Sequence, residues 1–162
     1  MERLIDPAAF REVLGAFASG ITVVAAVGDD GGPAGLACQS FASLSLDPPL
    51  VLLCVGRSSS SWPAVRAAGR FGVSILAEEQ REVCRALGRR GGEKFEGVDW
   101  EVSEHGAVRI RGSLATVDCA LEAVHEAGDH YLVTARVLAL TTRDGGSPLL
   151  YFRSAYATGA FG

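Results

Sequence analysis

The chain has 162 residues, of which 48% are hydrophobic and 21% charged, and its formal net charge is −4. This length suits one domain that buries a core without disulfides or metals, and the composition is that of a globular protein. The negative charge argues against a general nucleic-acid binder. No apolar run is long enough to span a membrane, and Met1–Phe10 lacks the apolar segment of a secretory signal, so we expect a cytoplasmic protein.

The first predicted element is a helix. Asp6 can cap it, Pro7 suits its first turn because the missing N–H has no partner there, and Gly15 weakens its end. An apolar face follows from the spacing of four residues at i, i+3, i+4 and i+7: Phe10, Val13, Leu14 and Phe17.

Strands dominate the rest of the chain. We expect them at 21–27, 34–46, 50–55, 70–76, 112–124, 131–142 and 149–152, with helices only at 62–68 and 78–87 and a mobile loop at 88–94. Many strands with short turns, and helices only as excursions, predict an all-β-dominated fold with peripheral α-helices. The expected architecture is a single antiparallel barrel domain over residues 1–162, with Greek-key-like connections.

Familiar catalytic motifs are missing from the sequence. It contains no HExxH, no GxSxG, no Walker-type phosphate loop and no GxGxxG after a strand. The four cysteines, Cys38, Cys54, Cys84 and Cys119, form no CxxC pair, so neither zinc nor a thioredoxin-like site is expected. Any chemistry should therefore come from a bound cofactor that the protein positions.

Three segments are candidates for binding that cofactor. Small and hydroxylated residues in 35–50 would let a flat ligand approach the backbone, although a polar edge strand would look the same. Arg57 and four serines precede the helix at 62–68, where a phosphate could bind, although a solvated turn with a serine cap is the alternative. His130 enters a strand from a Gly-Asp turn and could point into a cleft, or it could simply lie on the surface of a hairpin.

The order and spacing of these segments resemble the flavin reductase-like family of split-barrel FMN-binding proteins, the small reductase components of two-component flavin monooxygenases. The resemblance covers nearly the whole chain. Its specific parts are the block from Ser40 to Leu50 (SFASLSLDPPL) and the turn Gly128-Asp129-His130. Further matching segments are 10–11, 17–24, 71–76 with Gln80, 94–100 and 148–153, and Ser154 stands where glycine is frequent in that family.

The resemblance implies a split β-barrel that binds flavin near a homodimer interface. The isoalloxazine ring would lie against the backbone of Cys38, Gln39, Ser40, Phe41, Ala42 and Ser43. The flavin phosphate would lie near Ser58 and Ser60, with Arg57 as a charged partner, and Lys94, Tyr151 and Arg153 belong to further matching segments that we expect to bind cofactor. His130 would position the nicotinamide.

The predicted function is therefore an NAD(P)H-dependent flavin reductase. It would pass a hydride from NADH or NADPH to FMN or FAD and supply reduced flavin to a partner monooxygenase. A flavin-dependent oxidoreductase on a similar barrel, or an electron-carrier module without free-flavin turnover, is the alternative. We also expect a homodimer because the strands at 50–55 and 131–140 carry more apolar surface than a small barrel interior needs. Neither nucleic acid nor membrane is an expected partner.

Overall fold

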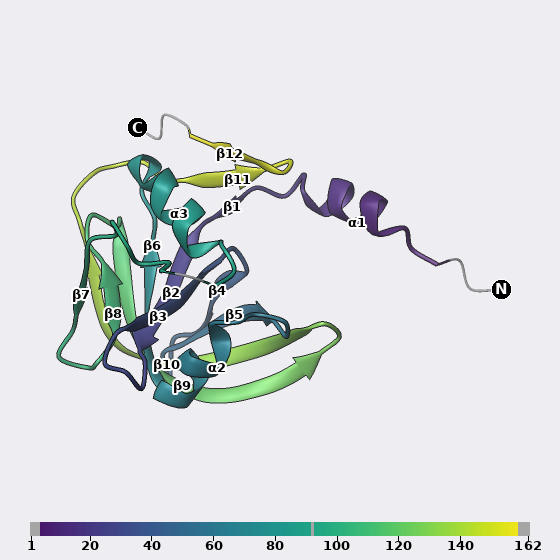
Figure 1. Ribbon diagram of the computed structural model, residues 1–162. Helices are drawn as coiled ribbons and strands as arrows, with labels where there is room; N and C mark the ends of the chain where they lie inside the picture. Colours follow the sequence, from purple (N-terminus) through teal and green to yellow (C-terminus); the bar gives the residue numbers. More distant parts are fainter. Residues whose placement is uncertain (1–3, 92, 159–162) are drawn as a thin grey trace.

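The computed structural model describes residues 4–91 and 93–158, and its centre is one antiparallel sheet with the strand order β3-β2-β6-β9-β10-β5-β4 (Figure 1). These strands are β2 (Thr22–Val27), β3 (Pro33–Cys38), β4 (Phe41–Ser45), β5 (Leu50–Gly56), β6 (Arg70–Ile75), β9 (Ala115–Ala127) and β10 (His130–Thr142). The β2–β6, β6–β9 and β10–β5 pairs join strands that are not consecutive in the chain, as a Greek-key-like path requires.

The sheet closes into a barrel at the junction between β3 and β4. These strands lie at opposite ends of the strand order, yet only Gln39 and Ser40 separate them in the chain. Because so short a link joins the two ends, the sheet has to curl until they meet. The backbone N–H of Cys54 in β5 donates to the Ser40 carbonyl over 3.0 Å at this junction. The predicted β-barrel with peripheral helices is confirmed.

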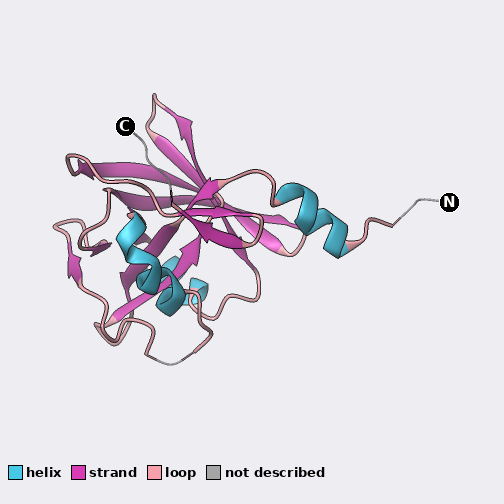
Figure 2. Ribbon diagram, turned by 90° about the horizontal axis from the view of Figure 1, so that it is seen from above, coloured by secondary structure: helices cyan, strands magenta, loops and turns pink. Residues whose placement is uncertain are grey.

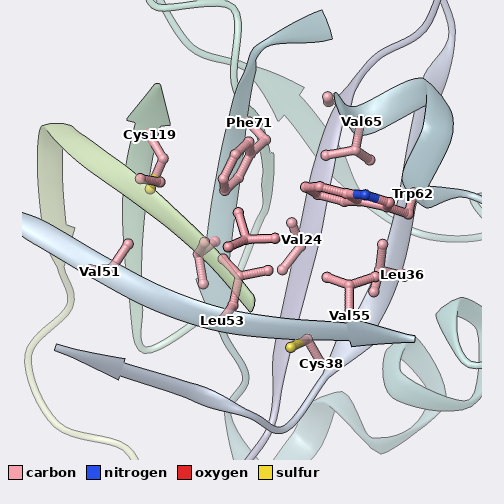
Figure 3. Close-up of a cluster of buried hydrophobic side chains, with 14 of the residues drawn as sticks. Val24, Leu36, Cys38, Val51, Leu53, Val55, Trp62, Val65, Phe71 and Cys119 are labelled. Atoms are coloured by element: carbon pink, nitrogen blue, oxygen red, sulfur yellow. The ribbon is translucent and has the colours of Figure 1, made fainter. Parts of the chain in front are cut away.

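The barrel interior is filled by alternate residues of its strands. In β5, Val51, Leu53 and Val55 are buried and their neighbours are half-buried. Helix α2 (Trp62–Ala68) adds Trp62 and Val65 to the same cluster, where Figure 3 shows them facing the side chains of the sheet. Because successive side chains of a strand point to opposite faces, every second residue of β5 enters the core and the residues between them face outward.

A second apolar cluster covers the other face of β2. The 3-10 turn η1 (Glu78–Gln80) leads into helix α3 (Arg81–Leu87), which packs here together with the hairpin of β7 (Trp100–Val102) and β8 (Val108–Ile110). Strand β2 is thus buried on both faces, which explains its uninterrupted β-branched and alanine composition. This layer places Cys84 of α3 behind the β3–β4 junction.

The two C-terminal strands, β11 (Leu150–Phe152) and β12 (Ala155–Ala157), form a small separate sheet with β1 (Ser19–Gly20) in the order β1-β11-β12. Arg153 and Ser154 make the β11–β12 turn with φ angles of 50° and 61°. Two-residue hairpin turns need this left-handed backbone, which glycine adopts most easily. The turn geometry thus gives a physical reason for the glycine that usually stands at the position of Ser154.

Helix α1 (Pro7–Leu14) forms as predicted but does not pack on the barrel. The Asp6 carboxylate accepts the Ala8 N–H over 3.2 Å, and the helix ends at Gly15. No residue of α1 is buried, and the helix projects from the body in both views (Figures 1 and 2). The amphipathic pattern therefore predicted the helix correctly, although its apolar face has no contact in the core of its own chain.

Several predicted boundaries were wrong. The expected strand at 34–46 is two strands, because the chain crosses from one sheet edge to the other at Gln39 and Ser40. The helix at 78–87 is divided into η1 and α3, and the long strand expected from 112 to 124 runs instead from 115 to 127. Strands β1, β7, β8 and β12, each two or three residues long, were not predicted. Gly92 of the expected mobile loop lies outside the described residues.

None of the helices in the described part of the chain combines the length and the apolar character needed to cross a bilayer.

Candidate functional site

The β3–β4 junction lines a hollow of about 560 Å³, which we call the ring hollow. Its walls come from the junction and β4, from β5 and from the segment around β1: Phe17, Ala18, Ser19, Gly20, Gln39, Ser40, Phe41, Ala42, Leu52 and Cys54. Gln39, Ser40 and Ala42 are exposed there, because the crossing from β3 to β4 leaves them outside the barrel. The structure thus brings together most of the residues predicted to contact the flavin ring.

A second hollow of about 250 Å³ continues from the first and shares Gln39, Ser40 and Cys54 with it. His130 lines this histidine hollow, although it lies 90 residues further along the chain. The pairing of β10 with β5 places His130 directly opposite Gly56, so strand register delivers the imidazole to the flavin segment. A Cβ added at Gly56 would lie 4.0 Å from Nε2 of His130, so the missing side chain keeps this space open.

Among the described residues, Asp129 is the hydrogen-bond partner of the His130 side chain. Its Nδ1 lies 2.8 Å from Oδ1 of Asp129, and this hydrogen bond, together with the charge of a protonated imidazole, lowers the pKa of Asp129 below its ordinary value. A neutral His130 bonded in this way carries its proton on Nδ1 and leaves Nε2 as an acceptor. The predicted nicotinamide residue therefore faces the hollow with one free ring nitrogen.

Arg57 anchors the turn that carries His130. Its backbone N–H donates to the Asp129 carbonyl over 2.9 Å, and its guanidinium donates to the Gly128 carbonyl over 3.4 Å. The same guanidinium lies 3.6 Å from a Glu126 oxygen and 5.6 Å above the centre of the Tyr131 ring. Arg57 was predicted as a phosphate contact, and the structure places it beside the β9–β10 turn with these partners.

A third hollow of about 650 Å³, the lysine hollow, opens near Gly35 at the middle of β3. Lys94 is the single lysine of the chain, and its Nζ lies 2.9 Å from Oγ of Ser61 and 3.5 Å from the Gly35 carbonyl. Burial lowers the pKa of Lys94 below that of an ordinary lysine. Ser60 also lines this hollow, so Ser60, which was predicted to bind the phosphate, lies with Lys94, which was predicted to bind cofactor.

The serines before α2 have separate partners. Oγ of Ser59 accepts the Trp62 N–H over 3.2 Å and so caps the start of the helix. Oγ of Ser58 accepts from Arg90 over 3.3 Å and points to the 88–91 segment. Ser61, which the sequence did not single out, is the serine bonded to Lys94. The run of serines predicted a polar loop, but only the fold assigned a partner to each hydroxyl.

The three hollows follow β3 in sequence order, from Gly35 in the lysine hollow to Ser40 in the other two. Five residues of extended chain span about 17 Å, so the lysine hollow lies about that far from the other two along β3, and we refer to the three hollows together as the groove. The ring hollow and the lysine hollow fall within the volume range of small-molecule sites, about 300–1,000 Å³, and the histidine hollow is slightly smaller. The missing side chain at Gly56, the exposed Gln39–Ser40 link and a cation at the far end fit a flat ring with a phosphorylated tail, which is the chemistry of a flavin nucleotide.

Other predicted residues contribute differently or lie outside the groove. The thiol of Cys38 belongs to the barrel core and donates to the Cys54 carbonyl over 3.4 Å, and burial raises its pKa to about 11; Cys38 lines the histidine hollow but not the ring hollow. Ser43 lies on β4 beyond the ring hollow. Tyr151 packs on Tyr156, with ring centres 5.8 Å apart, and Arg153 lies beside α1. Their roles in binding stay predictions.

Some residues of the groove were not predicted at all. Ala18–Gly20 and Leu52 enter the ring hollow from β1 and β5, and Gly56 and Cys84 line the histidine hollow. The signal for Gly56 was present, since a glycine at the end of an apolar strand often marks a close approach. Nothing in the sequence places Cys84 near the groove, because α3 reaches it only through the second apolar cluster.

Comparison with known proteins decides the family. The model of the flavin reductase like domain matches residues 14–160. The chain belongs to this family. It is 49% identical, over 94% of its length and 77% of the relative, to the reductase subunit HsaB of a flavin-dependent monooxygenase from Rhodococcus jostii (strain RHA1).

Two solved structures of this family are also similar along nearly the whole chain. Nitrilotriacetate monooxygenase component B from Mycobacterium thermoresistibile has 46% identity and a TM-score of 0.91, with 94% of this chain and 86% of that chain covered. The NADH:FAD oxidoreductase SgcE6 of Streptomyces globisporus, solved in complex with NAD and FAD fragments, has 33% identity and a TM-score of 0.89, with 98% of both chains covered. The split-barrel fold and the family resemblance are thereby confirmed.

Proposed function

We propose that this chain is an NAD(P)H-dependent flavin reductase whose groove holds FMN or FAD. The observation that carries the proposal is the histidine hollow, where His130 and the Gln39–Ser40 link share one space that adjoins the ring hollow. A flavin ring on the link would present a face beside His130, where a nicotinamide can stack. Membership in the flavin reductase family and the relatives' nicotinamide- and flavin-dependent activities support the same conclusion.

The residues of the groove would act mainly by positioning. The bound flavin supplies the chemistry, since it accepts a hydride from the nicotinamide. Lys94 and Ser60 would bind a phosphate, and Gln39 and Ser40 would fix the plane of the ring. His130 would accept a hydrogen bond from the nicotinamide amide at Nε2 while Asp129 holds Nδ1. Holding the flavin and nicotinamide rings in contact would lower the activation barrier by several kcal/mol, and no proton carrier is needed for this effect.

The decisive experiment is stopped-flow oxidation of NADH and NADPH with FMN, FAD and riboflavin in parallel. We expect rapid oxidation that depends on added flavin, which identifies a reductase that releases its product. Tightly bound flavin that copurifies with the chain and shows no response to free flavin would instead identify an electron-carrier module. The ratio of the FMN, FAD and riboflavin rates then gives the preferred flavin.

Two partners follow from the proposed activity. Reduced flavin must be used before oxygen consumes it, so we infer a flavin-dependent monooxygenase as the recipient, as the relative from Rhodococcus jostii is a reductase subunit of one. We also infer a homodimer, because apolar residues remain on the outer side of β5 and on α1. Light scattering at micromolar concentration tests the dimer, and a single-chain mass of 16.9 kDa would contradict it.

A further inference from the structure

The lysine hollow is larger than a phosphate group requires. Its volume of about 650 Å³ exceeds even that of the ring hollow, about 560 Å³. Lys94 lies at the Gly35 carbonyl of β3, and the hollow continues past this point to Pro33 and Asp30. Because β3 runs from Pro33 toward Cys38, these last two residues lie farther from the ring hollow than Gly35 does. Space for a further group therefore remains beyond the proposed phosphate.

Two aromatic residues, Phe95 and Trp100, line this space, and we call them the aromatic wall. Their ring centres are 6.4 Å apart and their planes meet at 76°. Both residues are half-buried, because they also pack on the second apolar cluster. A Cβ added at Gly35 would lie 3.0 Å from the Phe95 ring, so the missing side chain makes room for the wall. Aromatic rings that are packed in this way offer a fixed surface for stacking a flat group.

The β7–β8 hairpin that carries Trp100 is fastened to the barrel by buried polar contacts. Arg109 of β8 donates to both carboxylate oxygens of the fully buried Asp118 of β9, over 2.9 and 2.7 Å. The N–H of Ile110, which pairs with Trp100 in the hairpin, donates to Oγ of the buried Ser74 over 3.0 Å. Trp100 is therefore in position before a ligand enters, so little conformational entropy is lost when one binds.

The polar groups of the lysine hollow are mostly carboxylates. Asp30, Glu93 and Glu96 line it, and Lys94 is the one cation among its described lining residues. Carboxylates repel an additional free phosphate, but they accept hydrogen bonds from an aromatic amino group and from sugar hydroxyls. One cation, an aromatic wall and several acceptors together match the chemistry of an adenosine that is joined to a phosphate.

We propose that the far part of the lysine hollow is an adenosine subsite, in which the adenine of FAD stacks on the aromatic wall, so that this chain binds FAD more tightly than FMN. The inference rests on the proposed reductase function and names its flavin. FMN ends at its phosphate and leaves the subsite empty, whereas FAD continues from that phosphate to adenosine. Trp100 presents the larger ring of the wall and is the residue that sets the preference. NADH also carries an adenosine, so the experiments separate the two sources.

Trp100→Leu tests the stacking, because leucine keeps apolar packing on the hairpin but removes the aromatic surface. Stacking of a base on an aromatic side chain changes affinity by roughly 5- to 150-fold. We expect FAD binding to weaken by about tenfold in this variant, since leucine retains some contact, and FMN binding to stay nearly unchanged. Trp100→Phe should restore part of the FAD affinity. Val102→Ala is the matched control, since Val102 lies on the same strand, is 50% exposed and does not line the hollow.

Tryptophan fluorescence measures the subsite without any flavin. The chain has two tryptophans, and Trp62 is only 2% exposed in the barrel core, whereas Trp100 lines the hollow. Titration with ADP should quench part of the emission of the parent chain and should leave Trp100→Leu, which retains Trp62 alone, unchanged. ADP should also displace FAD but bind alongside riboflavin, which has neither phosphate nor adenosine. A parent chain whose emission does not respond to ADP would overturn the subsite.

Affinities and kinetics decide between the two sources of adenosine. The parent chain should bind FAD at least about tenfold more tightly than FMN, and Trp100→Leu should keep the parent's KM for NADH when FMN is the flavin. Equal affinity of the parent for FAD and FMN would overturn the proposal. A raised KM for NADH with unchanged FAD affinity would also overturn it, because the subsite would then belong to NADH. A chain that binds FAD and ADP as expected but oxidises no NADH would overturn only the reductase activity.

Discussion

The two ends of the groove hold their polar groups in opposite ways. At the histidine end, the side chains of His130 and Asp129 are 50% and 97% exposed and are carried on a hairpin turn. At the lysine end, Lys94 is partly buried, bonded to Ser61 and the Gly35 carbonyl, and its pKa is lowered by that burial. A fixed cation suits the phosphate of a flavin that must be held during hydride transfer, and an exposed, adjustable pair suits the nicotinamide that enters and leaves at each turnover.

The difference predicts separable defects. Changes at the lysine end should alter flavin affinity and leave the nicotinamide steps intact, while changes at the histidine end should do the reverse. The space between the two ends is shared, so filling it should damage both. The variants below run from the largest expected effect to the smallest.

Gly56→Leu should cause the largest loss, because its side chain would enter the hollow of about 250 Å³ between β5 and His130. We expect kcat/KM for both flavin and NAD(P)H to fall by roughly 100-fold or more, since neither ring can then reach the other. Steady-state kinetics measure the loss. Ala67→Leu, which adds similar volume on the exposed side of α2, serves as the control and should behave like the parent chain. Normal kinetics of Gly56→Leu would show that the rings do not meet in this hollow.

Lys94→Met should weaken FMN binding by roughly 10- to 100-fold, the value of one lost charge-assisted hydrogen bond, and leave riboflavin nearly unchanged. Lys94→Arg keeps the charge and should restore part of the affinity. Titration calorimetry with both flavins separates the phosphate from the ring. Equal losses of affinity for FMN and riboflavin would show that Lys94 does not bind the phosphate.

The burial of Lys94 also predicts a pH dependence. The ammonium binds phosphate only while protonated, and its pKa is lower than that of an ordinary lysine, 10.5. FMN affinity of the parent chain should therefore decline, as pH rises, at a lower pH than an exposed lysine would allow. The Lys94→Arg variant should show no such decline in the same range, because the guanidinium stays charged.

His130→Ala should raise the Michaelis constant for NAD(P)H and slow hydride transfer by about tenfold, since one orienting contact is lost and no essential proton carrier. Flavin affinity should hardly change, because the Gln39–Ser40 link and Lys94 remain. Stopped-flow traces with FMN already bound separate the two effects. A variant that loses flavin instead would place His130 at the flavin end of the site.

Asp129→Asn should have the smallest effect, a few-fold rise in the NAD(P)H Michaelis constant, because the amide can still bond Nδ1 but no longer carries a charge. The pKa of Asp129 lies below its ordinary value of 3.8, so the carboxylate is ionised at every pH of the assay and its contribution is lost only in strong acid. If Asp129 acts through His130, the double variant with His130→Ala should be no worse than His130→Ala alone. If the losses of the two single variants add in the double variant, Asp129 contacts the nicotinamide independently of His130.

Much of the groove was predictable from local patterns. The small and hydroxylated residues of 35–50 marked the segment of Gln39 and Ser40, the Gly-Asp turn presents His130, and the serines precede a helix with proline in its first turn. Each pattern had a plain alternative, and single residues could not decide between them. The family resemblance grouped them into one predicted site, although it did not assign Arg57 to the turn or separate Ser59 from Ser61.

The sequence by itself determined the elements whose signals are local. Proline, aspartate and glycine mark the ends of α1 and α2, and the apolar run at 50–55 predicts the strand that becomes β5. Only the tertiary structure decided which surfaces meet. The two helices have similar length and the same early proline, yet α2 buries Trp62 and Val65 and α1 buries nothing. Amphipathic periodicity predicts that one face of a helix is apolar. The direction of that face in α1 is decided by the pairing of β1 with β11 and by the hydrogen bond from the Arg153 N–H to the Gly15 carbonyl.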